Sequence, residues 1–173
     1  YGFEMSIEKP SGRFNGRLSY NYGKSDYQID VINQGRWYPY RFDKTHSLTM
    51  LSNFQITKDL SISSTFLYST GRPVTLPEGY YHISGIPFPY WEGRNKYRLP
   101  DYHRLDLGIK YSPNFLIRWT RGLKTTIDVA LYNVYDRRNI HTINYNQGQN
   151  RLFEQIGQST YGFMPSININ VEF

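Results

Sequence analysis

The stretch Pro165-Ser-Ile-Asn-Ile-Asn-Val-Glu-Phe173 alternates between apolar and polar residues at every position. Successive side chains of a β-strand point to opposite faces, so this pattern predicts a strand with one face away from water and the other toward it. The apolar positions are Pro165, Ile167, Ile169, Val171 and Phe173. The same period of two recurs along the chain, and it decides the fold class.

Six further segments alternate in this way. They cover residues 1–8, 13–22, 45–56, 60–69, 103–111 and 123–131. No segment keeps the 3.6-residue period of an amphipathic helix over more than two turns. We therefore predict an all-β fold with seven strands.

The composition excludes several classes of protein. The 173 residues include 17 Tyr, 10 Phe and 3 Trp, yet the mean hydropathy is only -0.62. No apolar stretch approaches the ~20 residues that a membrane-spanning helix needs. The chain has no cysteine, which excludes disulfides and cysteine-ligated metals, and its net charge of +6 is not gathered into a basic run. We expect no transmembrane helix and no nucleic-acid partner.

The connections between the predicted strands differ in length in a regular way. Residues 10–12 and 57–59 are short turns, and 113–122 is an intermediate connection. The other three connections, 23–43, 70–101 and 136–164, are long. In an up-and-down meander, alternate connections lie at the same end of the sheet, so the short and long connections fall at opposite ends. This asymmetry is typical of outer-membrane β-barrels, and the strand lengths match the ~9 to 11 residues that cross a bilayer at a tilt.

Aromatic residues on the apolar side of the strands gather toward two levels. The level near the short turns contains Phe14, Phe54, Tyr111 and Phe173, and the other contains Tyr1, Phe3, Tyr20, Tyr22, Phe66, Tyr68 and Tyr135. Amphipathic rings are most stable where hydrocarbon meets lipid headgroups, so two levels indicate the two girdles of a membrane barrel. The alternative is a soluble, carbohydrate-binding β-sandwich, which would stay in solution without detergent.

Seven strands are too few to close such a barrel. An open sheet would leave unpaired backbone groups in hydrocarbon, and single-chain bacterial barrels have even strand numbers from about 8 upward. Tyr1 also begins inside a predicted strand. We therefore expect residues 1–173 to be the C-terminal portion of a larger transmembrane antiparallel barrel whose plug domain and first strands are absent from this sequence. The alternative is an eighth strand within 74–86 and a small closed barrel.

Three segments resemble a known family. They are Arg98-Leu-Pro-Asp-Tyr-His-Arg-Leu-Asp-Leu107, Leu131-Tyr-Asn-Val-Tyr-Asp-Arg-Arg-Asn139 and the closing stretch quoted above. In this order they resemble the last barrel strands of TonB-dependent outer-membrane transporters of the Bacteroidetes type. The resemblance implies a hairpin outside the membrane, in which 140–147 pairs with 151–156 around Gly148. It also implies that Ile167, Ile169, Val171 and Phe173 form the C-terminal signal that the barrel-assembly machinery recognises.

The resemblance implies that the complete protein takes up a nutrient, such as a chelate, a glycan or a peptide, across the bacterial outer membrane. The barrel of that family has about 22 strands and contains a plug. TonB would contact the missing N-terminal part, and lipopolysaccharide, outer-membrane lipid and a surface lipoprotein are further expected partners. Two alternatives are a non-transporting barrel subunit that is a structural or docking component of a surface complex, and a small closed barrel that acts as an anchor or adhesin.

The long loops hold the candidate contacts for a ligand or partner. These are Arg36, Trp37, Tyr38 and Tyr40 in the first loop, and Tyr90, Trp91 and Arg94 in the second. Rings beside guanidinium groups suit stacking on sugars or aromatic chelates and contact with anions. The structural alternative is that the rings and prolines pack the loops into a rigid cap.

The sequence contains no catalytic constellation. Its histidines, His46, His82, His103 and His141, are scattered, and none has a second His at metal-ligand spacing on one strand face. Asp101 would share a face with His103 if the strand already begins there, and we expect a structural role for this pair. We therefore expect no enzymatic activity, no metal site and no cofactor. Charged residues on the polar side of the strands are expected to form a solvated wall; they are Glu4, Glu8, Arg13, Arg17, Arg104, Asp106, Lys110, Lys124 and Asp128.

Overall fold

The computed structural model describes residues 1–113, 124–147 and 153–172. Strands make up 61% of the structure, and the described residues contain one helical segment, the single 3-10 turn η1 (Asn33–Gly35). The chain is therefore all-β, as its periodicity predicts. None of the described residues belongs to a helix that is long and apolar enough to cross a membrane.

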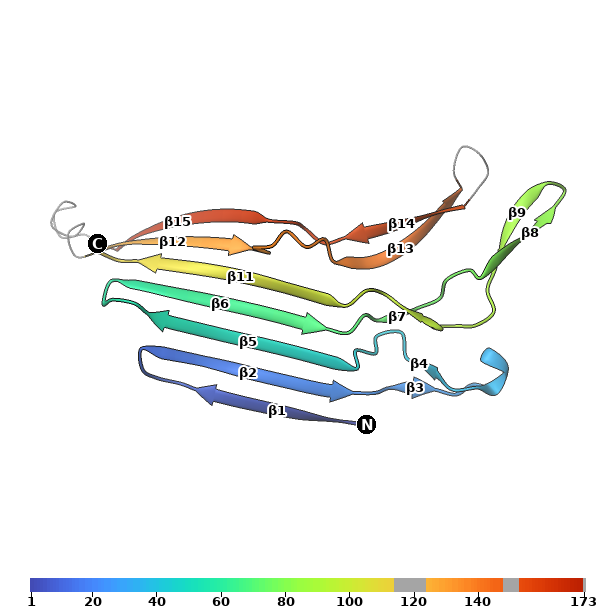
Figure 1. Ribbon diagram of the computed structural model, residues 1–173, viewed down its shortest axis with the longest axis horizontal. Helices are drawn as coiled ribbons and strands as arrows, with labels where there is room; N and C mark the ends of the chain where they lie inside the picture. Colours follow the sequence, from blue (N-terminus) through green and yellow to red (C-terminus); the bar gives the residue numbers. More distant parts are fainter. Residues whose placement is uncertain (114–123, 148–152, 173) are drawn as a thin grey trace.

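Seven strands form one antiparallel sheet in the order β1-β2-β5-β6-β11-β12-β15 (Figure 1). Their bounds are β1 Gly2–Lys9, β2 Phe14–Gly23, β5 His46–Gln55, β6 Leu60–Ser69, β11 Tyr102–Tyr111, β12 Lys124–Tyr132 and β15 Met164–Glu172. These are the seven strands that the sequence predicts, and each begins and ends within about one residue of its predicted bounds. The predicted strand bounds are accurate because alternation with a period of two is a strong signal over eight to ten residues.

Shorter strands lie in the long loops and pair only with one another. They are β3 (Asp26–Tyr27) with β4 (Tyr38–Pro39), β7 (Pro73–Val74) with β10 (Tyr97–Arg98), β8 (Gly79–Ile83) with β9 (Ile86–Tyr90), and β13 (Ile140–Gln147) with β14 (Phe153–Ser159). The expected hairpin after β12 is present, although its second strand runs to 159 instead of 156; Gly148 and residues 151–152 lie outside the described residues. An eighth sheet strand within 74–86 is wrong, because β7 and β8 join β10 and β9 and not the seven-stranded sheet.

The short turns and the long loops lie at opposite ends of the sheet (Figure 1). At the turn between β5 and β6, the backbone N–H of Thr57 donates to the carbonyl of Leu60 over 3.1 Å. The first loop (24–45), the second loop (70–101) and the third loop (133–163) extend from the other end. Part of the connection after β11, residues 114–123, lies outside the described residues. The arrangement is the meander that the connection lengths predict.

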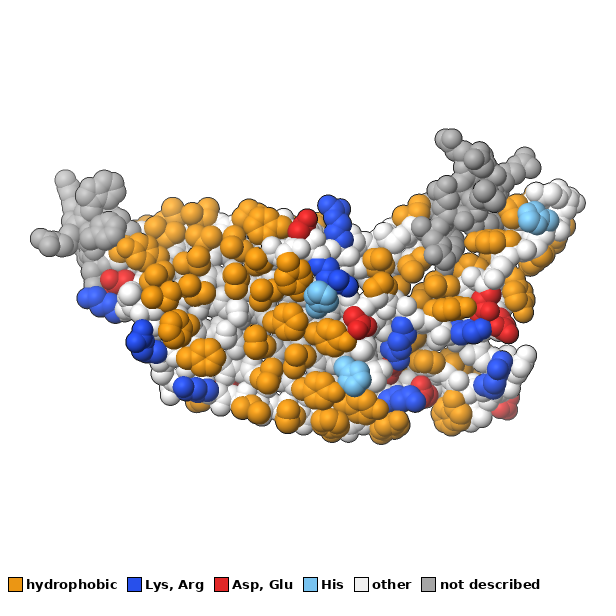
Figure 2. All heavy atoms as spheres, viewed as in Figure 1, with side chains coloured by type: hydrophobic (Ala, Val, Ile, Leu, Met, Phe, Trp, Pro, Cys, Tyr) orange, Lys and Arg blue, Asp and Glu red, His pale blue; other side chains and the backbone are white. Residues whose placement is uncertain are grey.

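One side of the sheet, here called the apolar face, carries the apolar member of each alternating pair. Cross-strand register places Ile7, Leu18, Met50, Phe66 and Leu105 in one continuous row. Figure 2 shows this face covered by apolar side chains over the strands, with charged side chains gathered toward its two ends. Many of its residues are well exposed, including Phe3 at 56%, Ile7 at 61% and Ile167 at 69%.

The rings of the apolar face lie at two levels. Near the short turns, Phe14 pairs with Phe54 across β2 and β5. At the loop end, Phe3 lies 5.7 Å from both Tyr20 and Tyr22, ring centroid to centroid. Histidines extend the loop-end level: Tyr20 Oη lies 2.7 Å from His46 Nδ1, and Tyr135 Oη lies 2.9 Å from His103 Nδ1.

One aromatic residue of the described part of the chain does not fit the predicted levels, and the prediction for another is not tested. Phe66, expected in the loop-end level, pairs with Met50 and Leu105 and so lies one row farther inward. Phe173 lies outside the described residues. The two-level pattern therefore rests on the other rings.

The opposite side, here called the polar face, carries hydroxyl, amide and charged side chains in register. Ser6 and Ser19 lie 3.2 Å apart, Oγ to Oγ, and Arg17 Nε donates to Ser6 over 3.1 Å. Arg104 forms an ion pair with Asp106 at 2.8 Å, and its guanidinium lies 4.2 Å from the ring centroid of Tyr132. Charged side chains of both signs thus lie on this face, as the sequence predicts.

The described residues form a single layer. The main contacts between elements join hydrogen-bonded neighbours, so within 1–113, 124–147 and 153–172 the second sheet of a sandwich is absent. In the same residues β1 and β15 each have one neighbour, so the described sheet is open and does not by itself form the closed barrel. The buried apolar residues of this part of the chain, Tyr38 and Leu99, both lie in the loops.

Candidate ligand-binding site at the loop end of the sheet

The first and second loops are joined by two asparagine side chains. The Asn33 amide donates to the carbonyl of Arg94 over 3.0 Å and accepts the backbone N–H of Arg94 over 2.7 Å. Asn95, which is 7% exposed, donates from Nδ2 to the carbonyl of Pro39 over 2.8 Å. Such paired amide bonds fix the backbone of both partners. The two loops therefore form one cap over the end of the sheet.

An ion pair between Asp43 and Arg98 joins the same loops closer to the strands. Asp43 Oδ2 lies 2.5 Å from Arg98 Nη2, while its two oxygens also accept hydrogen bonds from Ser25 N–H at 2.9 Å and Thr45 Oγ1 at 3.0 Å. Burial alone would raise the pKa of Asp43, but the hydrogen bonds from Arg98, Ser25 and Thr45 outweigh it and hold this pKa below its ordinary value. Asp43 is therefore an ionised structural anchor.

Asp101 anchors the start of the second loop to its end. Its carboxylate accepts the Tyr68 hydroxyl at 2.7 Å and the Gly71 N–H at 2.9 Å, and these two bonds lower the pKa of Asp101. Gly71 is tightly enclosed, because a Cβ added there would lie 1.6 Å from the carbonyl oxygen of Leu99. Only glycine fits so close an approach of two backbones.

The third loop is held by the segment 131–139, which is one of the three that carry the family resemblance. Asn133 is completely buried, has φ +52°, and donates from Nδ2 to the carbonyls of Arg137 at 2.9 Å and Tyr161 at 3.1 Å. Asn139, 2% exposed, binds both backbone groups of His103: Oδ1 accepts its N–H and Nδ2 donates to its carbonyl. These asparagines position the exit of β12 against β11. The sequence analysis did not predict this structural role of the two asparagines, because it considered segment 131–139 only as a motif.

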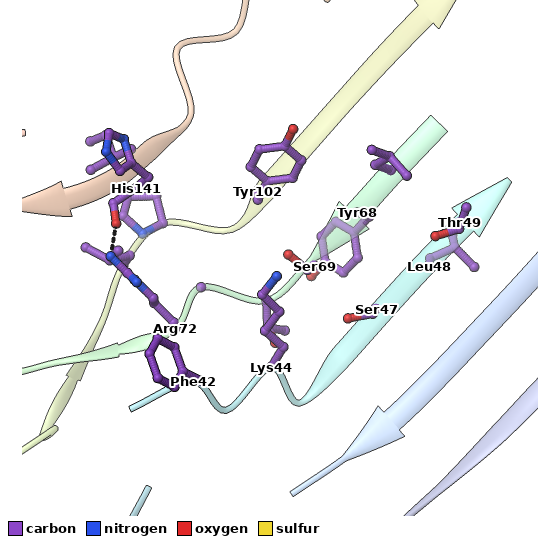
Figure 3. Close-up of a pocket in the computed structure, with 16 residues that line it drawn as sticks. Phe42, Lys44, Ser47, Leu48, Thr49, Tyr68, Ser69, Arg72, Tyr102 and His141 are labelled. Atoms are coloured by element: carbon purple, nitrogen blue, oxygen red, sulfur yellow. Dashed lines mark hydrogen bonds between the residues drawn. The ribbon is translucent and has the colours of Figure 1, made fainter. Parts of the chain in front are cut away.

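A hollow of about 450 Å³ lies where these loops meet the polar face of the sheet (Figure 3). The loops contribute Phe42, Lys44, Arg72 and His141, and the sheet contributes Tyr102 and a row of hydroxyls from Ser47, Thr49 and Ser69. The Arg72 guanidinium donates to the backbone carbonyl of His141, which ties the third loop to the second. The hollow thus combines the cations of Lys44 and Arg72 with several rings and neutral hydrogen-bonding groups.

A groove of about 260 Å³ shares Arg72 and Leu99 with this hollow. Two more guanidinium side chains, Arg41 and Arg94, line it, together with Thr75, Asn95 and Thr142 among others. Arg41 lies 4.6 Å from the ring centroid of Phe42, which lines the larger hollow. The hollow and the groove together are called the basic hollow below.

Of the sequence-predicted loop contacts, four come together and three do not. Arg36, Trp37, Tyr38 and Arg94 line a third hollow of about 250 Å³ beside η1, which shares Arg94 and Asn95 with the groove. The Tyr40 ring instead packs against Tyr27 at 5.2 Å and Phe42 at 5.5 Å. Tyr90 and Trp91 are 53% and 50% exposed at the end of β9 and line none of these hollows.

The exposed fractions of the predicted contact residues show which of them are structural and which are accessible to a ligand. Tyr38 is only 4% exposed and belongs to the interior of the cap, as the structural alternative holds, whereas Trp37 is 67% exposed. Lys44 and Arg72 were missed, because each is a single charge beside a turn and only the fold brings them together. The described part of the chain contains no group of three or more His, Cys, Asp or Glu that could hold a metal ion.

The C-terminal positions Ile167, Ile169 and Val171 lie on the apolar face of β15. They pair across the sheet with Val129, Ile127 and Thr125 respectively, and all three are well exposed. Phe173 is outside the described residues. Comparisons with models of protein families, with curated proteins and with solved structures give no match to this chain. Inference about its function therefore rests on the geometry and on the sequence.

Proposed function

We propose that this chain is part of the wall and the extracellular cap of a transmembrane β-barrel in the bacterial outer membrane. The complete protein is proposed to import a nutrient through it by TonB-dependent transport. The observation that carries the proposal is a single-layer sheet with one exposed apolar face and two levels of rings. In water this face would be a large apolar patch, whereas a bilayer covers it.

The spacing of the two levels supports this proposal. Phe14 and Tyr22 are eight residues apart on β2, which is about 26 Å along a strand at ~3.3 Å per residue. A strand tilt of ~40° reduces this to roughly 20 Å of height, close to the ~25 Å apolar band of outer-membrane barrels. Between these levels the face carries residues such as Leu18, Met50 and Leu105.

The polar face and the open edges fit the same proposal. Charged residues of both signs, such as Arg17 and Asp106, suit a wall that faces a water-filled or plugged lumen. The outer backbone groups of β1 and β15 would need partners in lipid, so we propose that further strands of the barrel continue the sheet at both edges.

The resemblance of segments 98–107, 131–139 and 165–173 to the last strands of TonB-dependent transporters supports transport as the function. A second candidate is a non-transporting barrel subunit that docks a surface partner. The amide and ion-pair bonds that brace the first loop to the second favour it, because a rigid cap suits a docking surface.

Single cysteines test the membrane face, since the chain has none of its own. Met50→Cys lies on the apolar face and Asn53→Cys lies three residues away on the polar face of the same strand. In isolated outer membranes, a water-soluble maleimide should label Asn53→Cys and spare Met50→Cys, while both react after denaturation. Equal labelling of the two in membranes, or a complete protein that stays in solution without detergent, would contradict the proposal.

Crosslinking to TonB separates the two candidate functions. A transporter should form a crosslink between its N-terminal part and TonB in energised cells, and the crosslink should increase when substrate is bound. A docking subunit should form none while it still reaches the outer membrane.

A further inference from the structure

The basic hollow holds positive charge that the described residues do not neutralise. Lys44, Arg41, Arg72 and Arg94 line it, and none of these four forms an ion pair with a carboxylate in the described part of the chain. The Arg72 guanidinium donates to the backbone carbonyl of His141, and Arg41 lies over the Phe42 ring. Four cations around two adjoining concavities therefore remain available to an anion.

The acidic residues nearby in the fold are already committed to other partners. Asp43 binds Arg98, and Asp101 binds Tyr68 and the Gly71 N–H. Glu78 and Glu92 both pair with Lys96. The excess of positive charge is thus a property of the assembled loops, which a count of charges along the sequence does not reveal.

The basic hollow also offers a surface for the uncharged part of a ligand. Phe42 and Tyr102 supply ring faces, and Ser47, Thr49 and Ser69 supply hydroxyls. Its larger part, about 450 Å³, falls within the usual range of small-molecule sites, about 300–1,000 Å³. Guanidinium groups bind carboxylates and phosphates with two parallel hydrogen bonds each.

We propose that the basic hollow binds a small ligand that carries at least two carboxylate groups. Arg41, Arg72 and Arg94 hold the anionic groups, and the rings hold the rest of the ligand. This inference rests on the proposed function, because it names the class of substrate that enters at the extracellular mouth of the barrel.

Calorimetric titration of the detergent-solubilised complete protein tests the proposal with three probes. Digalacturonate is an acidic disaccharide, cellobiose is a neutral one, and citrate is a polyanion without a sugar. We expect digalacturonate or citrate to bind at least about tenfold more tightly than cellobiose, and to weaken as salt increases. If digalacturonate binds more tightly than citrate, the anionic groups belong to an acidic sugar. If citrate binds more tightly, they belong to a ligand without a sugar.

Charge-removing variants locate the binding. Arg41→Gln combined with Arg94→Gln should weaken the better anionic probe about tenfold or more, because charge-assisted hydrogen bonds are lost. Lys58→Gln, which removes the same charge per site from the exposed turn between β5 and β6, should leave the affinity within about twofold. Circular dichroism on each variant checks that the fold is retained.

The inference is overturned if cellobiose binds as tightly as both anionic probes. It is also overturned if neither anion binds below about 10 mM, or if the double variant binds like Lys58→Gln. Failure of the proposed function is a separate result. It would appear as equal maleimide labelling of Met50→Cys and Asn53→Cys in membranes, whatever the titrations give.

Discussion

Asp43 and Arg98, 55 positions apart in the sequence, form the ion pair that joins the first and second loops. The Asp43 side chain is 2% exposed and that of Arg98 is 36% exposed, with Oδ2 and Nη2 2.5 Å apart. Arg98 also donates from Nη1 to the carbonyl of Gly71 at 2.9 Å. One guanidinium thus holds the first residues of the second loop against the last residues of the first.

Replacing Arg98 by Ala should loosen this cap. The variant leaves the buried Asp43 carboxylate without its charged partner, which costs on the order of 2–4 kcal/mol. We expect proteolytic cleavage within 24–45 and 70–101 to become at least about tenfold faster in the folded protein, because cleavage follows local opening. Timed digestion with mass spectrometry of the fragments measures it.

Lys24→Ala is the matched control for that digestion. It removes the Lys24–Asp26 ion pair, whose nitrogen and oxygen lie 3.3 Å apart, but the Lys24 side chain is 44% exposed. Exposed ion pairs contribute little to stability, so cleavage should stay near the wild-type rate. Equal acceleration in Lys24→Ala and Arg98→Ala would rule out a special role for the Asp43–Arg98 pair.

Acid should weaken the same cap in a defined range. The pKa of Asp43 and that of Asp101 are both below the ordinary value of 3.8 in the folded protein. A depressed carboxyl pKa contributes stability that is complete above the unfolded pKa and is lost as the pH falls through the folded pKa. We expect the loops to stay closed from pH 7 to about pH 4 and to open below it.

Fluorescence of Trp37, recorded from pH 7 to pH 2, follows this opening, because Trp37 belongs to the first loop and lines the hollow between it and the second loop. Other tryptophans are replaced by Phe so that the signal has one source. Asp43→Asn should reduce the acid-dependent change, since one of the two titrating carboxyls is gone. A transition centred above pH 5, or one unaffected by Asp43→Asn, would argue against these two carboxyls as its cause.

Gly71→Ala should displace the start of the second loop. The added Cβ would lie 1.6 Å from the Leu99 carbonyl oxygen, so the backbone must shift. This shift would disturb the 2.9 Å hydrogen bond that the Gly71 N–H donates to the Asp101 carboxylate. We expect a loss of stability of about 2–4 kcal/mol. Gly79→Ala is the control, because nothing lies within 4 Å of a Cβ at that position.

Urea denaturation of the two glycine variants in detergent compares them directly. The midpoint for Gly79→Ala should match the wild type, and that for Gly71→Ala should fall clearly below it. The same midpoint for both variants would mean that the close approach of the two backbones is not maintained in solution.

The sheet could be predicted from the sequence because its signal is local. Residues such as Ile167 and Asn168 alternate in polarity, and that pattern alone sets the strand and its two faces. The hairpin β8–β9 was not predicted, because Pro87 and Pro89 have no backbone N–H to donate to a neighbouring strand and are rare within strands. Proline is tolerated at both positions because β8 and β9 form a two-stranded ribbon, in which each strand is an edge strand.

The candidate site could be predicted only in part, because it is assembled from three loops. The aromatic and arginine-rich composition of the loops predicted Arg94 as a ligand contact, and Arg94 does line the basic hollow. The same composition also predicted Tyr38, which is buried inside the cap. Lys44 and Arg72 carry no local pattern. They meet only because Asp43 and Asp101 fix the loop ends, and this depends on contacts between residues dozens of positions apart.

Asn133→Ala should be among the most destabilising single changes in the third loop. It removes the amide that bonds to Arg137 and Tyr161, and it leaves buried backbone groups unpaired. Asn also tolerates the observed φ of +52° better than Ala does. The combined cost is about 3 kcal/mol, and cleavage within the third loop should rise while cleavage within 24–45 does not.

Asn168→Ala is the matched control, because Asn168 is exposed on β15 and its amide makes one long hydrogen bond, 3.4 Å, to Asn170. This variant should unfold at the wild-type urea concentration and resist protease like the wild type. A second variant, Asn133→Gly, restores the freedom to adopt positive φ without the amide. If Asn133→Gly recovers full stability, backbone conformation and not the hydrogen bonds explains why asparagine stands at the end of β12.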